Sequence, residues 1–393
     1  MSETLKYDKR GVSANKSEVH SAIKGMYKGL YPNAFCKILP DIVARDPDYC
    51  NIMHADTAGT KTSLAYIYWK ETGDLSVWKG VVQDSIVMNL DDMACVGCID
   101  DIIISSTIGR NKKQISAEVL KEVIQGTEIF LARMEKYGVK VTLAGGETAD
   151  VGDIVRTIDI GFTAFGRMKK EDVIDIKIKD GDVIVGFASY GQATYEDEYN
   201  GGMGSNGLTS ARHDVFHKAY MDKYPESYDP YVPKELIFCG NKAVDDKIEI
   251  DGYGVSTVGK LVLSPTRTYL PLLKKIIKTY KHSINGIIHC TGGAQTKVGK
   301  FVKDKKVIKD NLFPIPPLFQ MIEKQSGTSR KEMYQVFNMG HRLEIYTDKK
   351  TAEDLIEISK LMNIDARIIG RVKRHEGVEI AITDDKGIYH YRS

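Results

Sequence analysis

Four acidic residues stand at the ends of predicted elements in the first half of the chain: Asp56, Asp84, Asp92 and Glu147. Asp84 and Asp92 are eight residues apart in a predicted helix, close to the same face. Carboxylates gathered in this way suit Mg²⁺, which takes oxygen ligands and keeps waters while it bridges nucleotide phosphates. The set therefore predicts a magnesium site for phosphate chemistry, with solvated caps and surface charges as the alternative.

Three turns are of the type that holds phosphate. Gly59-Thr60-Lys61 places flexible backbone, a hydroxyl and an ammonium beside the start of a predicted helix. Ser205-Asn206 precedes a second predicted helix, and Thr291-Gly292-Gly293 precedes a third. Each predicts an anion site at a helix start.

Two familiar nucleotide-binding classes are excluded. The segment Ala294–Lys300 has Ala where a Walker A loop needs its first Gly, and Phe301 stands where Ser or Thr should bind the metal. Gly202–Gly207 matches G-x-G-x-x-G, but a long loop separates it from the strand that ends at Ala188, so the dinucleotide-binding context is missing.

Composition excludes several other classes. The chain has 393 residues, 42% of them hydrophobic, which favours two ordinary cores over disorder. The 55 basic and 53 acidic residues leave a net charge of +2, so no overall basic field exists to hold nucleic acid or a membrane. No apolar run is long enough to span a bilayer, and the start lacks a signal sequence. We expect a cytoplasmic protein whose six scattered cysteines are reduced thiols.

The elements that position these residues form two units. Periodicity and turn signals predict strands at 52–56, 102–108, 139–143 and 156–167, with helices at 16–30, 64–69, 83–97 and 116–137. The first domain is predicted to span residues 1–172 and the second residues 173–393. The second contains an insertion at 222–259 and a terminal hairpin at 378–391. Its predicted strands are 183–188, 261–263, 286–289, 342–347 and 366–372. Its predicted helices are one that begins at 208 and those at 268–280, 318–325 and 352–362.

The motifs occur in an order that resembles a known family. They are Tyr7–Val12, Asp56–Lys61, Gly145–Ala149, Ser205–Gly207, Pro265–Arg267, Thr291–Gly293 and Met333–Gly340. Together they resemble the phosphoribosylformylglycinamidine cyclo-ligase (aminoimidazole ribonucleotide synthetase) family over nearly the whole chain. The resemblance implies a two-domain α+β fold, with an N-terminal sheet domain that pairs across a homodimer and a C-terminal α/β domain. It also implies ATP-dependent cyclisation of formylglycinamidine ribonucleotide, with Mg²⁺, in purine biosynthesis.

The resemblance also implies residue roles, carried over motif by motif. Catalysis would involve Asp56, Lys61, Glu147 and Asn206, and Mg²⁺ would be held by Asp56, Asp84, Asp92 and Glu147. ATP would contact Gly59, Thr60, Lys61, Asp92, Gly145, Gly146 and Thr148. The small-molecule ribonucleotide would contact Ser205, Asn206, Gly207, Thr291, Gly292, Gly293 and Arg342.

The chain departs from the family pattern at three places, all in the second domain. Gly204 stands where the family commonly has His, Gly292–Lys297 replaces a triple-glycine motif followed by Glu-Asn, and Gly340–Leu343 replaces Gly-Val-Gly-Met. Two alternatives therefore remain open. One is a sister ATP-dependent kinase or amide-activating enzyme with another small substrate, and the other is a nucleotide-binding scaffold without turnover.

Overall fold

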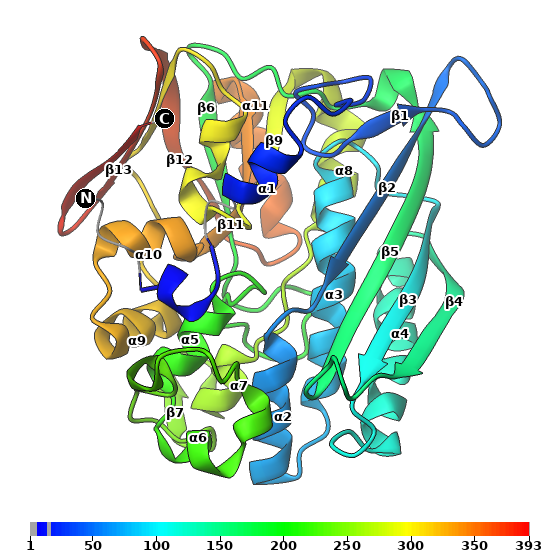
Figure 1. Ribbon diagram of the computed structural model, residues 1–393. Coiled ribbons are helices and arrows are strands. Elements are labelled where there is room, and N and C mark those ends of the chain that lie inside the picture. The colour runs from blue at the N-terminus through cyan, green and yellow to red at the C-terminus, as the bar shows by residue number, and fades with distance from the viewer. Residues whose placement is uncertain (1–5, 14–16, 393) are drawn as a thin grey trace.

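The protein, described here by a computed structural model, consists of two mixed sheets with helices packed against them (Figure 1). The structure describes residues 6–13 and 17–392. A five-stranded sheet has the order β1-β2-β5-β3-β4, and a seven-stranded sheet has the order β14-β13-β10-β12-β6-β11-β9. The predicted two-unit α+β fold is confirmed.

The first sheet is formed by β1 (Ile38–Pro40), β2 (Tyr49–Thr57), β3 (Ile102–Arg110), β4 (Val141–Asp150) and β5 (Ile158–Lys169). The helices α3 (Val77–Ala94) and α4 (Ala117–Lys136) lie on one side of it (Figure 1). Ile52 and Ile104 point to that side and are buried, whereas Met53 and Ile103 are 65% and 46% exposed. One face is therefore core and the opposite face is open, as alternation along antiparallel strands allows.

The edge strand β4 contains a local irregularity at its glycines. Its register against β3 shifts between Ile104 and Ser106, and Gly145 has φ +94°. A Cβ at Gly146 would lie only 2.4 Å from the backbone oxygen of Ser106. Only glycine allows β4 to approach β3 this closely.

The second sheet is formed by β6 (Val183–Ala188), β9 (Ile284–His289), β10 (Lys305–Lys309), β11 (His341–Thr347), β12 (Ala366–Arg374), β13 (Val378–Asp384) and β14 (Gly387–Arg392). The helices α8 (Leu270–Tyr280) and α11 (Lys349–Lys360) pack together beside it (Figure 1). The hairpin predicted at 378–391 is present as β13 and β14, which are paired antiparallel. No helix among the described residues is long and apolar enough to cross a membrane.

The remaining elements surround the junction of the two sheets. They are α1 (Ser17–Ala22), α2 (Lys61–Thr72), α5 (Leu208–Val215), α6 (Ala219–Lys223), β7 (Lys247–Ile250), β8 (Gly254–Thr257), α7 (Val258–Val262), α9 (Pro317–Ser326) and α10 (Arg330–Val336). The predicted insertion at 222–259 contains the β7–β8 hairpin and short 3₁₀ turns.

Three predicted elements were wrong in extent or type. The acidic helix begins at Val77 rather than Gln83, because Trp78, Val81 and Val82 extend its buried face. The strand predicted at 261–263 is part of the helix α7, which the Thr257 hydroxyl caps by accepting from Lys260 N. The helix predicted at 16–30 is only Ser17–Ala22 within the described residues, and residue 16 lies outside them.

Candidate active site

The predicted motifs meet where the first domain packs against the loops of the second. Thr60, at the start of α2, shares a 2.8 Å hydrogen bond between hydroxyls with Thr209 of α5. Lys61 Nζ donates across the same boundary to the Ser264 carbonyl at 2.6 Å. The Gly-Thr-Lys turn and the Ser-Asn-Gly turn, about 145 residues apart in sequence, therefore lie side by side.

Lys61 forms a buried ion pair with Asp84, and both side chains are fully shielded from solvent. Asp84 Oδ1 accepts from Lys61 Nζ at 2.8 Å, from Thr266 N at 2.7 Å and from Thr266 Oγ1 at 2.5 Å. Its other oxygen, Oδ2, is buried without a hydrogen-bond partner among the described residues. Burial raises the pKa of Asp84 and lowers the pKa of Lys61, because both charged forms are kept from water.

Asp92 lies between two histidines. Arg342 Nε donates to His289 Nε2 at 3.2 Å, so the ring proton of His289 sits on Nδ1 and is donated to Asp92 Oδ1 at 2.7 Å. Burial lowers the pKa of His289. Burial alone would raise the pKa of Asp92, but the charge of Lys297 and the bonds from His289 and His54 outweigh it and lower the pKa well below its usual range. Asp92 is therefore a permanent anion beside a neutral imidazole.

His54 reaches Asp92 from the other side. The Asn89 amide donates to the Ser85 and Phe162 carbonyls, so its oxygen accepts from His54 Nδ1 at 2.9 Å. His54 Nε2 then lies 3.5 Å from Asp92 Oδ2. Burial opposes the charge on His54, but Asp92 and Asn89 raise its pKa overall.

Arg342 carries an unused donor into the site. Its side chain is fully buried, its Nη2 donates to the Arg267 carbonyl, and its Nη1 has no partner among the described residues. A Cβ at Gly204 would lie 3.6 Å from Arg342 Nη1 and Cδ, so the guanidinium lies against the position where Gly204 lacks a side chain. Ser205 Oγ is likewise buried without a partner.

Arg267 is held differently. Its Nε and Nη2 donate to the two Glu196 oxygens at 2.9 and 2.5 Å, and its Nη1 donates to the carbonyls of Ala188 and Tyr190. Such a bidentate pair fixes the orientation of a guanidinium. Arg267 therefore supports the loop that contains Thr266 and has little capacity left for a ligand.

The fourth predicted carboxylate, Glu147, lies apart from Asp56. Asp56 is on β2, on the same face as His54, whereas Glu147 is exposed on the edge strand β4. Asp56 pairs with Phe162, Phe162 with Ser106, and Ser106 with Gly146, the neighbour of Glu147. Three strand spacings correspond to roughly 14 Å. Within one chain, Glu147, together with Gly145, Gly146 and Thr148, does not meet Asp56.

The Thr-Gly-Gly turn lies beside the Ser-Asn-Gly turn. A Cβ at Gly292 would be 3.7 Å from Asn206 Nδ2, and Gly293, at φ +93°, leads into a 3₁₀ helix, Ala294–Lys300. Lys297, in that helix, donates to Thr291 Oγ1 at 2.5 Å. Asn206, Thr291 and Gly292, predicted as substrate residues, are therefore brought together by the fold.

The donor set fits a divalent cation. Asp92 is ionised, Asp56 stands on the adjacent strand, and Asp84 Oδ2 is a buried carboxylate oxygen that no hydrogen-bond donor among the described residues reaches. These are hard oxygen ligands, as Mg²⁺ requires. Asp84 and Asp92, however, are eight residues apart on α3, about 12 Å along the helix axis, so the two carboxylates cannot hold one ion as the sequence predicted. Each has the oxygen donors that Mg²⁺ takes.

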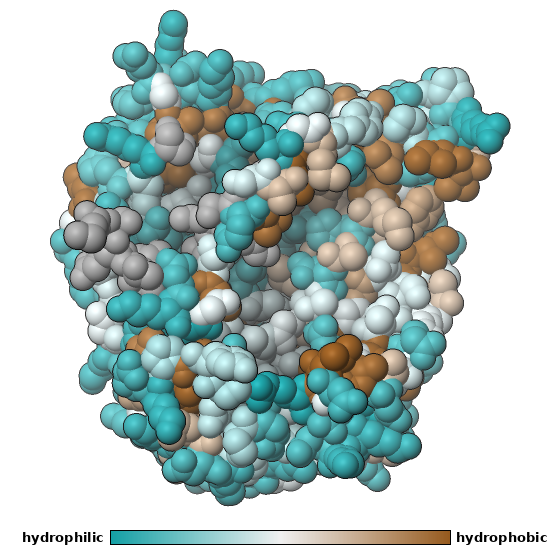
Figure 2. Space-filling view, in the orientation of Figure 1, coloured by the Kyte–Doolittle hydropathy of each residue, from teal (hydrophilic) through white to brown (hydrophobic). Residues whose placement is uncertain are grey.

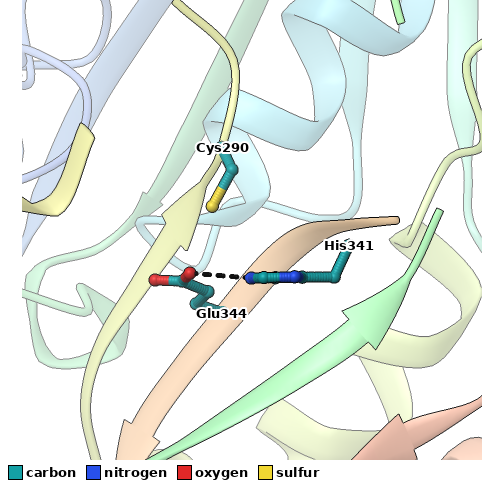
Figure 3. A group of neighbouring side chains, drawn as sticks. All are labelled: Cys290, His341 and Glu344. Atoms are coloured by element: carbon teal, nitrogen blue, oxygen red, sulfur yellow. Dashed lines mark hydrogen bonds and ion pairs between the residues drawn. The ribbon is translucent and has the colours of Figure 1, made fainter. Parts of the chain in front are cut away.

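A second group of possible metal ligands lies deeper in the second sheet. Ligand atoms of Cys290, His341 and Glu344 all lie within 4.8 Å of one another (Figure 3). The buried Lys309 ammonium, however, is paired with Glu344 Oε1, and Tyr346 donates to Oε2 at 2.7 Å. Burial also raises the pKa of the Cys290 thiol, which disfavours a thiolate ligand. An ammonium already supplies the positive charge here, so the group is a structural network.

Two family models match the chain in sequence. Residues 38–168 match the N-terminal domain of AIR synthase related protein, and residues 179–383 match its C-terminal domain. The chain belongs to the AIR synthase related protein family. It is similar to the phosphoribosylformylglycinamidine cyclo-ligase of Methanocaldococcus jannaschii, with 28% identity over 83% of this chain and 79% of that protein. The protein of the same name from Methanococcus vannielii is 29% identical over 85% of this chain and 80% of the relative.

Solved structures share the fold. AaThiL complexed with AMPPCP and TMP superposes with a TM-score of 0.54 and 14% identity, over 95% of this chain and 96% of that one. Thermotoga maritima PurL complexed with AMPPCP gives a TM-score of 0.52 at 11% identity, over 99% of this chain and 49% of that one. At these identities the likeness concerns the fold, including both sheets.

Sequence reasoning missed the two histidines that flank Asp92. His289 ends β9 directly before Cys290 and the Thr-Gly-Gly turn, and His54 precedes Asp56 by two residues on the same strand face. A polar residue on the inward face of a strand that ends at a predicted site was the available signal. Lys297 was noticed only as part of a motif that departs from the family pattern.

Proposed function

We propose that the protein catalyses the ATP-dependent cyclisation of formylglycinamidine ribonucleotide to aminoimidazole ribonucleotide, with release of ADP and phosphate. The observation that carries the proposal is the ionised Asp92, held between His289 and His54 where the two domains meet. The family membership and the names of its relatives give the reaction class.

The reaction has two steps. ATP phosphorylates the formyl amide oxygen, which converts a poor leaving group into phosphate, and the nitrogen that closes the ring then attacks that carbon while phosphate leaves. The protein's contribution is mostly positioning and charge neutralisation. Asn206, Thr291 and Gly292 orient the ribonucleotide, while the neutral His289, held by Arg342, donates its one N–H to Asp92 and fixes that carboxylate.

Mg²⁺ would be held by Asp56, Asp84 and Asp92, with Asp84 and Asp92 on different ions because about 12 Å of helix separates them, and it would neutralise the charge of the ATP phosphates. Gly59, Thr60 and Lys61 form the adjoining turn, and Lys61 acts mainly by holding Asp84. All six cysteines are free, five of them buried, which agrees with a reducing compartment such as the cytoplasm.

The active unit is a homodimer formed through the first sheet. Its open face carries Met53 and Ile103, and Figure 2 shows pale to brown surface on the side where Figure 1 draws β2 and β5. A second copy packed on this face would bury apolar side chains that are otherwise exposed. It would also bring the β4 edge, with Gly145, Gly146, Glu147 and Thr148, toward the partner's β2. Glu147 could then reach the proposed magnesium site of the partner subunit.

The test is turnover of formylglycinamidine ribonucleotide with Mg-ATP, followed by detection of the aminoimidazole product. Asp92→Asn should abolish most of the activity, while Asp153→Asn, at an exposed carboxylate outside the site, should leave it unchanged. Absence of product from the wild-type protein, under conditions where an established cyclo-ligase is active, would refute the proposal.

The departures in the second domain favour one other candidate, an ATP-dependent kinase or amide-activating enzyme with a different small substrate. The Arg342 guanidinium lies next to the position where a side chain at residue 204 would begin, in the part of the site assigned to the substrate. Rescue of a purine auxotroph that lacks the cyclo-ligase would argue against this candidate. Activity that survives both Asp56→Ala and Asp92→Ala would instead favour a scaffold without turnover.

A further inference from the structure

Lys297 is a half-buried cation at the substrate side of the site. Its ammonium donates to Thr291 Oγ1 at 2.5 Å and lies 4.5 Å from the centre of the Phe35 ring. No ion pair joins it to a carboxylate within residues 6–13 and 17–392. Its charge is the strongest favourable influence on Asp92, so the ammonium lies within electrostatic range of the reacting region.

Of the other cations nearby, Arg342 keeps one donor, Nη1, unused by the described residues within its buried guanidinium, whereas three more are already engaged. Lys61 is paired with Asp84, Arg267 with Glu196 and Lys309 with Glu344, and each of these three side chains is fully buried. An ammonium has three donors. Lys297 therefore has two left to offer a ligand, and it is far more accessible than the three paired cations.

Further donors lie on and beside the Thr291–Gly293 turn, to which Lys297 bonds. The Asn206 side-chain amide lies beside Gly292 and has no hydrogen-bond partner in the described part of the chain. The backbone amides of Gly292 and Gly293 likewise donate to no acceptor among the residues described here. Donors that converge without an acceptor form a site for an anionic oxygen.

We propose that Lys297, with Asn206 and the amides of Gly292 and Gly293, binds the phosphate group of the ribonucleotide substrate. This inference rests on the function proposed above and adds a residue that determines specificity. The alternative phosphate is that of ATP, but Lys297 bonds to Thr291 of the turn proposed to hold the ribonucleotide, and no hydrogen bond joins it to the Gly-Thr-Lys turn among the described residues. A phosphate held at Lys297 would place the other end of the ribonucleotide toward Asp92 and ATP.

The test compares Lys297→Met with Lys297→Arg and with Lys303→Met, which alters an exposed lysine of the following loop. Loss of a charge-assisted hydrogen bond should raise the KM for the ribonucleotide by about 10- to 100-fold. The KM for ATP should change less than about threefold, and Lys297→Arg should recover most of the loss because it keeps the charge. Ribose 5-phosphate should compete with the ribonucleotide in the wild type and should lose at least tenfold in inhibition in Lys297→Met.

Direct binding of ribose 5-phosphate, measured by titration calorimetry, separates this inference from the proposed function. If the wild type turns over but Lys297→Met keeps its ribonucleotide KM, the inference fails alone. A rise only in the KM for ATP, or a fall in kcat with both KM values unchanged, would also overturn it, because Lys297 would then serve ATP or position Asp92. If the wild type has no cyclo-ligase activity, the proposed function fails, and loss of ribose 5-phosphate binding in Lys297→Met would still support a phosphate site.

Discussion

Two lysine–carboxylate pairs lie fully buried in this molecule, Lys61–Asp84 at the domain boundary and Lys309–Glu344 inside the second sheet. They have the same charges and the same burial, but their surroundings differ. Both oxygens of Glu344 accept hydrogen bonds, from Lys309 and His341 on one side and Tyr346 on the other. In Asp84, Oδ1 accepts three hydrogen bonds, whereas Oδ2 has no donor among the described residues.

The pKa shifts follow this difference. Burial would raise the pKa of Glu344, but Lys309 and His341 outweigh it and lower the pKa to about 2. At Asp84 the donors do not compensate for burial, and its pKa is raised. A saturated pair is a structural element, whereas an unsaturated one keeps capacity for a ligand, which we propose to be a magnesium ion.

The largest expected effect is the loss of Glu344. Glu344→Gln leaves the Lys309 ammonium buried without a carboxylate and should reduce the free energy of unfolding by about 3–5 kcal/mol, measured by urea denaturation. The double variant Lys309→Met/Glu344→Leu removes both charges and should cost less than the single change. Equal losses from the single and the double variant would contradict a saturated ionic network.

Asp84→Asn should reduce activity more than stability, in contrast to Glu344→Gln. The pKa of Lys61 is already lowered by burial, so Lys61 can shed its proton, and we expect a loss of only about 1–2 kcal/mol in unfolding free energy. Turnover should fall by about 100-fold, since a proposed metal ligand is lost. Steady-state kinetics and urea denaturation of Asp84→Asn test this prediction. A larger loss of unfolding free energy than for Glu344→Gln would refute the difference between the two ion pairs.

The acid dependence of stability should differ as well. The pKa of Glu344 is lower in the folded protein than its ordinary 4.5, so its contribution is complete above that pH and is lost as pH falls toward about 2. The difference in unfolding free energy between wild type and Glu344→Gln should therefore shrink by about 2 kcal/mol from pH 6 to pH 3. A constant difference across this range would show that the pKa of Glu344 is not lowered by folding.

Tyr346→Phe should make the Lys309–Glu344 pair resemble the Lys61–Asp84 pair. It removes the donor to Glu344 Oε2, so the pKa of Glu344 should rise and the free energy of unfolding should fall by about 1–2 kcal/mol. Thr266→Val, which removes a hydroxyl donor from the already crowded Asp84 Oδ1, is the matched change and should cost about 1 kcal/mol or less. Denaturation of both variants checks the order, and a larger loss from Thr266→Val would contradict it.

Local pattern was enough for much of the fold. The strand, turn and helix at residues 52–69 follow from a short apolar strand and a Gly-Thr-Lys turn, and the 378–391 hairpin follows from two strands around a Gly-containing turn. The strand predicted at 261–263 failed because three apolar residues do not distinguish strand from helix, and the Thr257 cap decided it. The turns were predicted to hold phosphate because glycine, hydroxyl and charge stand together in the sequence, and this remains a prediction.

The sequence by itself determined the two-domain organisation, the family and the acidic residues placed at element ends. Only the tertiary structure decided which of those residues meet. His289 reaches Asp92 across 197 residues, and Thr266 reaches Asp84 across 182. It also placed Glu147 three strands away from Asp56. The physical reason is that charge and hydrogen-bonding capacity belong to the residue, whereas burial and the saturation of each oxygen are set by partners that packing brings from distant parts of the chain.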